Sequence, residues 1–89
     1  MRRRDYSDPI YTDWRRQVYK RDKHRCQMPG CGYRKYLQAH HIQKWASASS
    51  LRFDVDNGIT LCKNCHTKVT GHERQYESLF MEIVRKNNG

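Results

Sequence analysis

Residues 57–66, with the sequence Asn-Gly-Ile-Thr-Leu-Cys-Lys-Asn-Cys-His, decide most of what this chain can fold into. Asn57-Gly58 is a turn signal, and the run Ile59-Thr60-Leu61 that follows predicts a short strand. Cys62 and Cys65 are separated by two residues, a spacing that presents two sulfurs to one metal ion. The stretch therefore predicts a turn, a strand and the start of a metal-binding helix, in that order.

A second cysteine pair precedes this stretch. Cys26 and Cys31 flank the turn sequence Pro29-Gly30, which brings their thiols together. Two close pairs about thirty residues apart are typical of a zinc ion bound by four thiolates. Four protein ligands leave no open position, so this Zn²⁺ is predicted to be structural. Its predicted ligands are Cys26, Cys31, Cys62 and Cys65.

Two other arrangements of the cysteines remain open. In a secreted basic peptide they would form two disulfides, but Met1–Asp5 is charged and no apolar segment of a secretory signal follows. Alternatively, Cys26 and Cys31 would share a metal with two histidines, which would leave Cys62 and Cys65 unused at an ideal metal spacing.

Without an export signal we expect a cytoplasmic protein, and no apolar run is long enough to span a membrane.

The composition indicates one small domain that needs such a metal. The chain has 89 residues, a hydrophobic fraction of 36% and a mean hydropathy of −1.13. It contains only four Leu, four Ile and four Val. An apolar core of this size is marginal on its own, and small domains often add a metal or disulfides.

Positive charge is concentrated in the first half of the chain. Of the net charge of +9, residues 1–45 contribute 12 Lys and Arg against 4 Asp and Glu, whereas residues 46–89 contribute 6 against 5. A one-sided basic excess is typical of proteins that bind nucleic acid. The DNA contacts that we predict from it are Arg2, Arg3, Arg4, Arg15, Arg16, Lys20 and Arg21.

Hydrophobic periodicity and turn signals predict an α+β domain over residues 12–89, preceded by a basic, flexible arm over residues 1–11. Trp14 and Val18 share one face of the first helix, and an apolar stripe runs from Tyr76 to Val84 on the last. The expected elements are a helix from Thr12 or Asp13 to about Asp22, a strand over 36–41, a loop over 43–57, a strand over 59–61, a helix from Cys62 or Lys63 to Gly71 and a helix over 72–86.

Three of the five histidines lie where a second metal site is expected. His40 and His41 end a predicted strand, and His66 follows Cys65 on a predicted helix. Neighbouring helical residues point about 100° apart, so Cys65 can face the zinc while His66 faces a separate site. In a regular strand His40 and His41 point to opposite faces, so both serve one site only if the strand ends or bends there.

These residues occur in the order of a known family. Residues 39–42 (Ala-His-His-Ile), residues 57–62 and the pair Cys65-His66 resemble the HNH nuclease family, in particular its small phage and prophage endonucleases. The resemblance extends over roughly residues 11–75. It implies a small ββα-metal (His-Me finger) domain with flanking helices, in which a two-stranded ribbon and a helix bind one divalent metal beside a four-cysteine zinc. The preceding pairs Trp14-Arg15, Arg21-Asp22, Cys26-Gln27 and Cys31-Gly32 also resemble these proteins.

The resemblance implies a role for each residue of the motif. His40 and His66 would bind a catalytic divalent ion, which is Mg²⁺, Mn²⁺, Ni²⁺ or Zn²⁺. His41 would be the general base that activates water, and Asn57 would brace the loop that orients it. The enzyme would nick or cut DNA and leave 5′-phosphate and 3′-hydroxyl ends. His72 would be a third ligand, a phosphate contact or an ordinary surface residue.

The implied partner is DNA, with low sequence specificity because no recognition helix is evident. The resemblance also implies a phage or bacterial gene and, among possible partners, phage packaging machinery. Two other classes of function are considered. A non-catalytic zinc-knuckle module that binds DNA or acts as an adaptor would explain the charge and the cysteines, but not His40, His41, Asn57 and His66. A secreted, disulfide-rich basic toxin is disfavoured by the missing export signal.

Overall fold

A two-stranded ribbon forms the centre of the structure, a computed structural model that describes residues 8–43 and 53–88. Strands β1 (Leu37–His41) and β2 (Gly58–Cys62) pair in antiparallel register, with Leu37 opposite Cys62 and His41 opposite Gly58. Every residue of β2 is buried, because helices cover both faces of the ribbon. The predicted α+β class and the predicted ribbon are confirmed.

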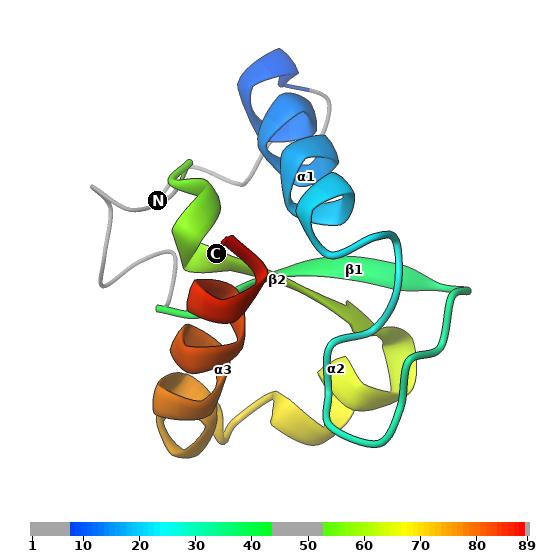
Figure 1. Cartoon of the computed structure of the whole chain (residues 1–89), viewed down its shortest axis with the longest axis vertical. Coiled ribbons are helices and arrows are strands. Elements are labelled where there is room, and N and C mark those ends of the chain that lie inside the picture. The colour runs from blue at the N-terminus through cyan, green and yellow to red at the C-terminus, as the bar shows by residue number, and fades with distance from the viewer. Residues whose placement is uncertain (1–7, 44–52, 89) are drawn as a thin grey trace.

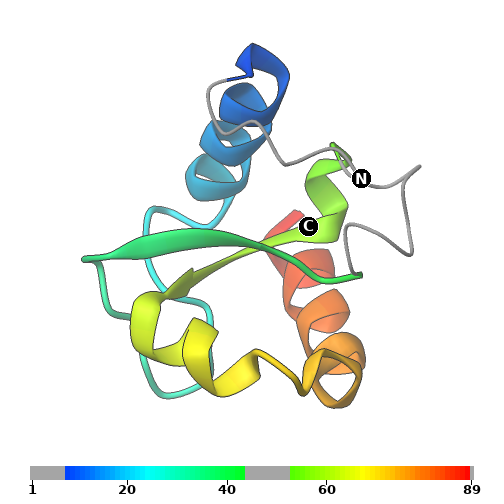
Figure 2. The same ribbon diagram turned by 180° about the vertical axis from the view of Figure 1, so that it is seen from behind.

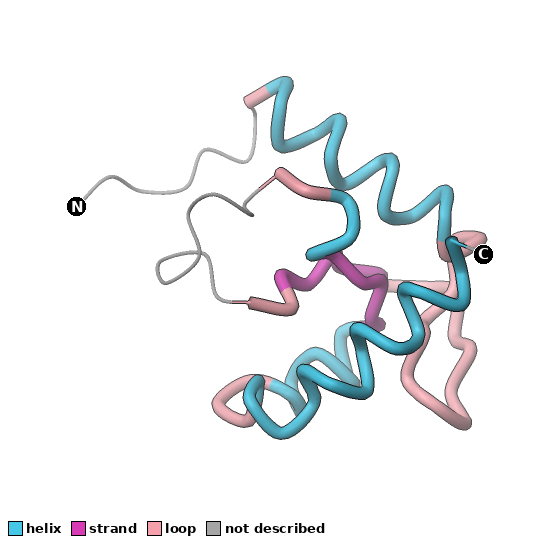
Figure 3. Tube along the Cα trace, turned by 60° about the vertical axis from the view of Figure 1, so that its left-hand side comes forward, coloured by secondary structure: helices cyan, strands magenta, loops and turns pink. Residues whose placement is uncertain are grey.

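The helices lie on two sides of this ribbon. Helix α1 (Pro9–Arg21) packs on one face, whereas α2 (Lys63–Val69) and α3 (Glu73–Asn88) pack on the other (Figures 1 and 2). A short 3₁₀ helix, η2 (Val55–Asn57), leads into β2 between α1 and α3. The Cα trace shows the strands enclosed between α1 and α3 (Figure 3). Among the helices described, none combines the length and the apolar composition that a membrane span requires.

Helix α1 begins earlier than the sequence predicted. The expected cap at Thr12 or Asp13 is wrong: the Asp8 carboxylate accepts a hydrogen bond from the Ile10 N–H, and Pro9 occupies the first helical position. Proline fits there because the N–H groups of the first turn have no hydrogen-bond acceptor within the helix, so the N–H that proline lacks is not needed. Three residues assigned to the flexible arm, 9–11, are therefore helical. Residues 1–7, which carry Arg2, Arg3 and Arg4, lie outside the described residues.

Two apolar clusters flank the ribbon because its residues alternate between the faces. Toward α1, the cluster of Tyr11, Trp14 and Val18 packs against Ala39 and Val55. Toward α2 and α3 lies a larger cluster, in which the predicted stripe of α3 contributes Phe80 and Val84 as buried residues. Its other buried members are Cys26, Ile42, Ile59, Leu61, Cys62, Cys65 and Val69.

A buried ion pair joins these layers. The Asp22 side chain is fully buried and accepts hydrogen bonds from Arg21 Nε (2.8 Å), the Thr60 N–H of β2 (2.9 Å) and Asn87 Nδ2 of α3 (2.9 Å). The Arg21 guanidinium also donates to the carbonyls of Val55 and Gly58. The network therefore fixes the end of α1 against η2, β2 and α3.

This network corrects one predicted DNA contact. The Arg21 side chain is only 8% exposed, and its donors are used by Asp22 and by the two backbone carbonyls. Arg21 is a structural residue, and we do not include it in a DNA-binding surface. The sequence showed its charge but not its burial.

The close approach of α1 to the ribbon depends on Gly58. A Cβ atom at this position would lie 2.6 Å from both Trp14 Cζ2 and Val18 Cγ2, closer than such contacts occur. The glycine therefore allows the Trp14 indole to reach the end of the ribbon, where the Trp14 Nε1 donates to the Asp54 carbonyl (2.9 Å).

Replacing Asp22 with Ala should lower the free energy of unfolding by about 3–5 kcal/mol, because it leaves the Arg21 guanidinium buried without its counter-charge. The measurement is urea denaturation followed by circular dichroism. The matched control is Asp13→Ala on the same helix: its side chain is 60% exposed and its contact with Arg16 is 4.0 Å long. This control should change stability by less than about 1 kcal/mol. Equal effects of the two variants would contradict a structural role for Asp22.

Candidate metal centre and active site

The four cysteines meet in one cluster. The sulfur atoms of Cys26, Cys31, Cys62 and Cys65 all lie within 4.8 Å of one another, and all four thiols are free. Tetrahedral zinc with Zn–S distances of about 2.3 Å places sulfurs about 3.8 Å apart. The 3.9 Å between the sulfurs of Cys31 and Cys62 fits this spacing. The cluster can therefore hold a metal with four sulfur ligands, and the disulfide alternative finds no support.

Local backbone bonds bring the cysteines together. The Cys31 N–H donates to the Met28 carbonyl and closes the predicted turn at Pro29-Gly30, while the Cys26 N–H donates to the Tyr33 carbonyl. Cys62 ends β2 and Cys65 lies in the first turn of α2. The metal would thus clamp the segment before β1 onto the junction of β2 and α2.

The cluster favours a thiolate at Cys62. Burial alone raises the pKa of this thiol, but the Cys65 N–H and the neighbouring thiols donate hydrogen bonds to its sulfur and lower the pKa to about 7. Burial raises the pKa of Cys26 and of Cys65. A metal ligand must be the thiolate, so the Cys62 sulfur is better prepared to bind the ion than those of Cys26 and Cys65.

His40 and His66 form a second candidate site on the α2 and α3 side of the ribbon. Their ring centroids are 5.4 Å apart, and the His40 ring also meets the edge of Phe80. His40 is 6% exposed, and within the described residues no hydrogen-bond partner meets its buried Nε2. Burial lowers the pKa of His40 to about 4, helped by His66 and opposed by the Glu73 carboxylate. A neutral imidazole with an unpartnered nitrogen is what a divalent metal requires of a ligand.

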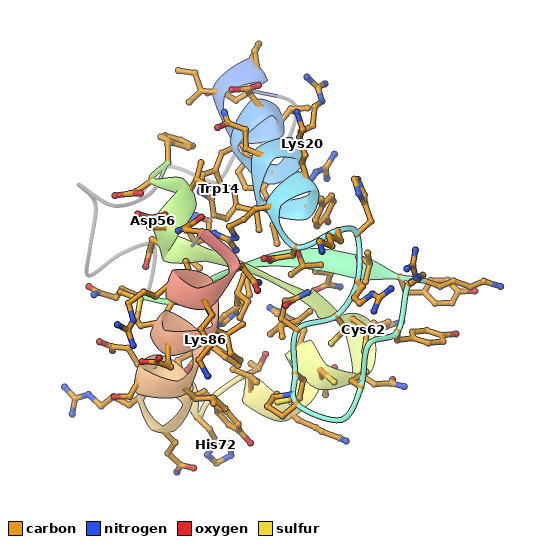
Figure 4. The ribbon with its side chains drawn as sticks, viewed as in Figure 1. Trp14, Lys20, Asp56, Cys62, His72 and Lys86 are labelled. Atoms are coloured by element: carbon orange, nitrogen blue, oxygen red, sulfur yellow. The ribbon has the colours of Figure 1, made fainter. Side chains whose placement is uncertain are left out.

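His41 lies on the other face of the ribbon. Its ring stacks on the Trp14 indole with centroids 4.2 Å apart and an interplanar angle of 10°. The strand ends at His41, so the ribbon stops where the two histidines diverge. Figure 4 shows Trp14 between α1 and the η2 segment. The sequence predicted Trp14 only as a core residue; its contact with His41 depends on tertiary packing.

Asn57 joins the two ends of the segment between the strands. It is 2% exposed, and its side chain accepts from the Gln43 N–H (2.9 Å) and donates to the Gln43 carbonyl (3.3 Å). Its own carbonyl accepts from the Ile42 N–H (2.8 Å). These bonds hold the two residues directly after His41 against Asn57.

Two hollows are each lined by one histidine, His66 in the first and His72 in the second. One, of about 320 Å³, is lined by His66, Tyr11, Arg15, Tyr19 and residues 37–39. The Arg15 guanidinium lies 6.0 Å from the centre of the Tyr11 ring, so this hollow, which His66 also lines, contains a cation. Of the other predicted DNA contacts on α1, Arg16 and Lys20 are exposed.

The other hollow, of about 540 Å³, is lined by His72, Glu73, Ile42 and Gln43, among others. His72 is exposed at the turn between α2 and α3 (Figure 4). Among the described residues, the only set of three or more metal-ligating side chains with clustered ligand atoms is that of the cysteines. His72 is therefore not placed as a third ligand beside His40 and His66. Glu73, an acidic residue in the first turn of α3, was not predicted as a site residue, but its charge raises the pKa of His40.

A family model described as HNH endonuclease matches residues 24–71, just over half of the chain. This chain belongs to the HNH endonuclease family. The match spans both cysteine pairs and the candidate site, so the resemblance seen in the sequence is confirmed at the level of the family. Membership implies a nuclease that acts on nucleic acid. Neither the comparison with curated proteins nor the comparison with solved structures gives a match.

We expect the four-cysteine site of this HNH protein to be essential for folding. Cys65→Ser should lose the bound metal and unfold, because such sites contribute about 10–16 kcal/mol in isolated zinc fingers, as much as the whole stability of a small domain. Metal analysis and circular dichroism provide the measurement. The control is Ser78→Ala, an exposed change on α3 that should keep both metal and fold. A folded, metal-free Cys65→Ser protein would overturn the prediction.

The lowered pKa of His40 predicts a pH dependence of stability. The unfolded chain binds a proton at His40 near pH 6.5, whereas the folded protein resists it down to about pH 4. Between these values the unfolded state holds more protons, so stability falls as the pH drops from 7 toward 4. Denaturation curves without added divalent ion should show a smaller loss for His40→Gln than for the parent. His24→Gln, an exposed change, should behave like the parent.

Proposed function

We propose that this protein is a metal-dependent DNA endonuclease with a ββα-metal centre made of β1, β2 and α2. The observation that carries the proposal is the buried Nε2 of His40, which has no hydrogen-bond partner among residues 8–43 and 53–88, on a ring 5.4 Å from that of His66. His41 is next in the chain. The zinc-knuckle alternative gives no reason to leave a polar nitrogen buried in this way, which is costly unless a ligand meets it.

In this proposal each site has its own metal. Cys26, Cys31, Cys62 and Cys65 hold a structural Zn²⁺, and His40 and His66 hold a catalytic divalent ion. When bound, that ion polarises the phosphate and stabilises the departing 3′ oxygen. Two protein ligands leave the remaining positions open for phosphate and water. The products then carry 5′-phosphate and 3′-hydroxyl ends.

His41 is the proposed general base. It takes the proton from the attacking water at the end of the ribbon, where β1 stops and Asn57 braces the following residues. The Trp14 indole holds the imidazole by stacking, and an aromatic face also favours the imidazolium that proton uptake creates. Trp14 and Asn57 are thus positioning residues for His41.

The proposed DNA contacts are cations near this site. Arg15 lies in the hollow that His66 also lines, so its guanidinium can bind a phosphate next to the one that is cut. Arg16 and Lys20 extend the positive charge along α1, and Arg2, Arg3 and Arg4 are proposed to add to it. Contacts of this kind are with the backbone, so sequence specificity should be low.

Replacing His41 with Ala should lower the rate of cleavage by about 10²–10⁴ and leave DNA affinity unchanged, because a general base acts on water rather than on the metal. His40→Ala and His66→Ala should instead weaken binding of the catalytic ion, and excess ion should partly restore cleavage. The measurement is plasmid cleavage across a metal titration, with metal affinity from calorimetry. His24→Ala is the matched control and should cleave like the parent.

Two outcomes would contradict the proposal. Cleavage at the parental rate by His41→Ala would remove His41 as the base. DNA binding without cleavage by the parent under every divalent ion would favour the zinc-knuckle module instead.

DNA affinity should fall steeply with salt, because phosphate contacts release counterions. Arg15→Gln should weaken binding and reduce the slope of log K against log salt by about 1. Arg85→Gln removes the same charge from α3, where Arg85 pairs with Glu82, and should change neither quantity. Fluorescence anisotropy over a salt series provides the measurement. Equal effects of the two variants would show that only net charge matters.

A further inference from the structure

A second surface lies beside the cysteine cluster, at the Leu37 end of β1, whereas His41 is at the other end. Tyr33 is 47% exposed and Tyr36 is 74% exposed, and the two cations between them are exposed as well. Both tyrosines line one hollow of about 430 Å³ with Cys62, Lys63 and Asn64. We call this set the knuckle surface: Tyr33, Arg34, Lys35, Tyr36, Lys63 and Asn64. The proposed active site uses none of these residues.

The backbone holds both tyrosines in place. The Tyr33 carbonyl accepts from the Cys26 N–H (2.7 Å), and the Tyr36 carbonyl accepts from the Lys63 N–H (2.9 Å). Each bond joins a tyrosine to a cysteine ligand or to its direct neighbour. The rings are therefore presented on a fixed framework, which lowers the entropy cost of binding a ligand.

The two segments that form the knuckle surface carry a net positive charge. No acidic residue occurs in residues 23–43 or 58–72. Four thiolates around one Zn²⁺ would contribute a charge of −2 there, which the six cations of these segments outnumber. The electrostatic complement of this surface is a polyanion. The six cations are Lys23, Arg25, Arg34, Lys35, Lys63 and Lys68.

We propose that the knuckle surface is a second nucleic-acid site, which takes unpaired bases of a single-stranded segment. The bases stack on Tyr33 and Tyr36, and the phosphates between them lie against Arg34, Lys35 and Lys63. Exposed aromatic rings interleaved with cations suit single strands, because only an unpaired base offers its face for stacking. In a duplex the bases are stacked inside the helix, so a duplex can contact only the cations of this surface. The inference rests on the proposed function only in taking nucleic acid as the substrate.

The position of the surface indicates which substrates benefit. Four residues of β1 lie between Tyr36 and His41, which corresponds to a span of about 16 Å at about 3.3 Å per residue. Stacked nucleotides rise about 3.4 Å each, so the unpaired bases lie about four to five nucleotides from the cut. DNA with a gap, fork or overhang at this distance should bind more tightly than blunt duplex.

The test measures binding of a labelled dT₁₂ strand and of a blunt duplex by fluorescence anisotropy, in the His41→Ala background to prevent cleavage. The double variant Tyr33→Ala/Tyr36→Ala should weaken dT₁₂ binding about five- to a hundredfold and duplex binding much less. Tyr33→Phe/Tyr36→Phe keeps both rings and should bind dT₁₂ like the parent. Ile10→Ala, an exposed apolar change on α1, is the control for lost apolar surface.

Charge is tested separately. Lys63→Gln should weaken dT₁₂ binding more than Lys86→Gln, which removes the same charge from α3. Metal content and circular dichroism of each variant show whether the cysteine cluster is intact. If a tyrosine variant loses metal, the parent protein is studied by nuclear magnetic resonance instead. Addition of dT₁₂ should then change the amide chemical shifts of Tyr33, Tyr36, Lys63 and Asn64.

The outcomes separate this inference from the proposed function. Unchanged dT₁₂ affinity of the alanine double variant, or equal losses for dT₁₂ and duplex, would overturn the knuckle surface as a stacking site while leaving the nuclease proposal intact. If the His41→Ala protein binds neither dT₁₂ nor the duplex, nucleic acid is not the ligand of this chain. That result would overturn both the knuckle surface and the nuclease proposal.

Discussion

A buried carboxylate at the end of α1 sets the geometry on which the rest of the structure depends. A charge inside a protein is stable only when it is paired and hydrogen-bonded. Asp22 meets this condition through Arg21, the Thr60 N–H and Asn87, which belong to or border three different elements. Because these partners must all be in place, α1 has little freedom to shift along the ribbon. The position of Trp14 against Gly58 and His41 follows from that constraint.

The two candidate metal sites share a very short helix. Cys65 and His66 are neighbours on α2, which has only seven residues and is too short to be stable alone in water. The sulfur cluster on one side and the apolar contacts of Val69 on the other hold this helix in place. The orientation of His66 toward His40 therefore depends on the cysteine site, and the two sites are energetically linked.

Much of this arrangement could be predicted from the sequence. The spacing of Cys62 and Cys65 and the turn at Pro29-Gly30 are local signals, and they predicted the cluster that the structure contains. The ribbon and the order of the helices were predicted by periodicity in the same way. Arg21 and Trp14 differ, because their roles depend on residues more than twenty positions away. A single sequence shows that Arg21 is charged, but not that its partners include the carbonyls of Val55 and Gly58.

The spacing of the Asp22 partners along the chain has a consequence for synthesis. Thr60 lies 38 residues after Asp22, and Asn87 lies 65 residues after it. Contacts over such separations carry a loop-closure cost and form late. A nascent chain that ends before α3 leaves this carboxylate without one of its partners and cannot complete the packing that places Trp14 on His41. We therefore expect the Trp14 and His41 rings to reach their stacked arrangement only once α3 has left the ribosome.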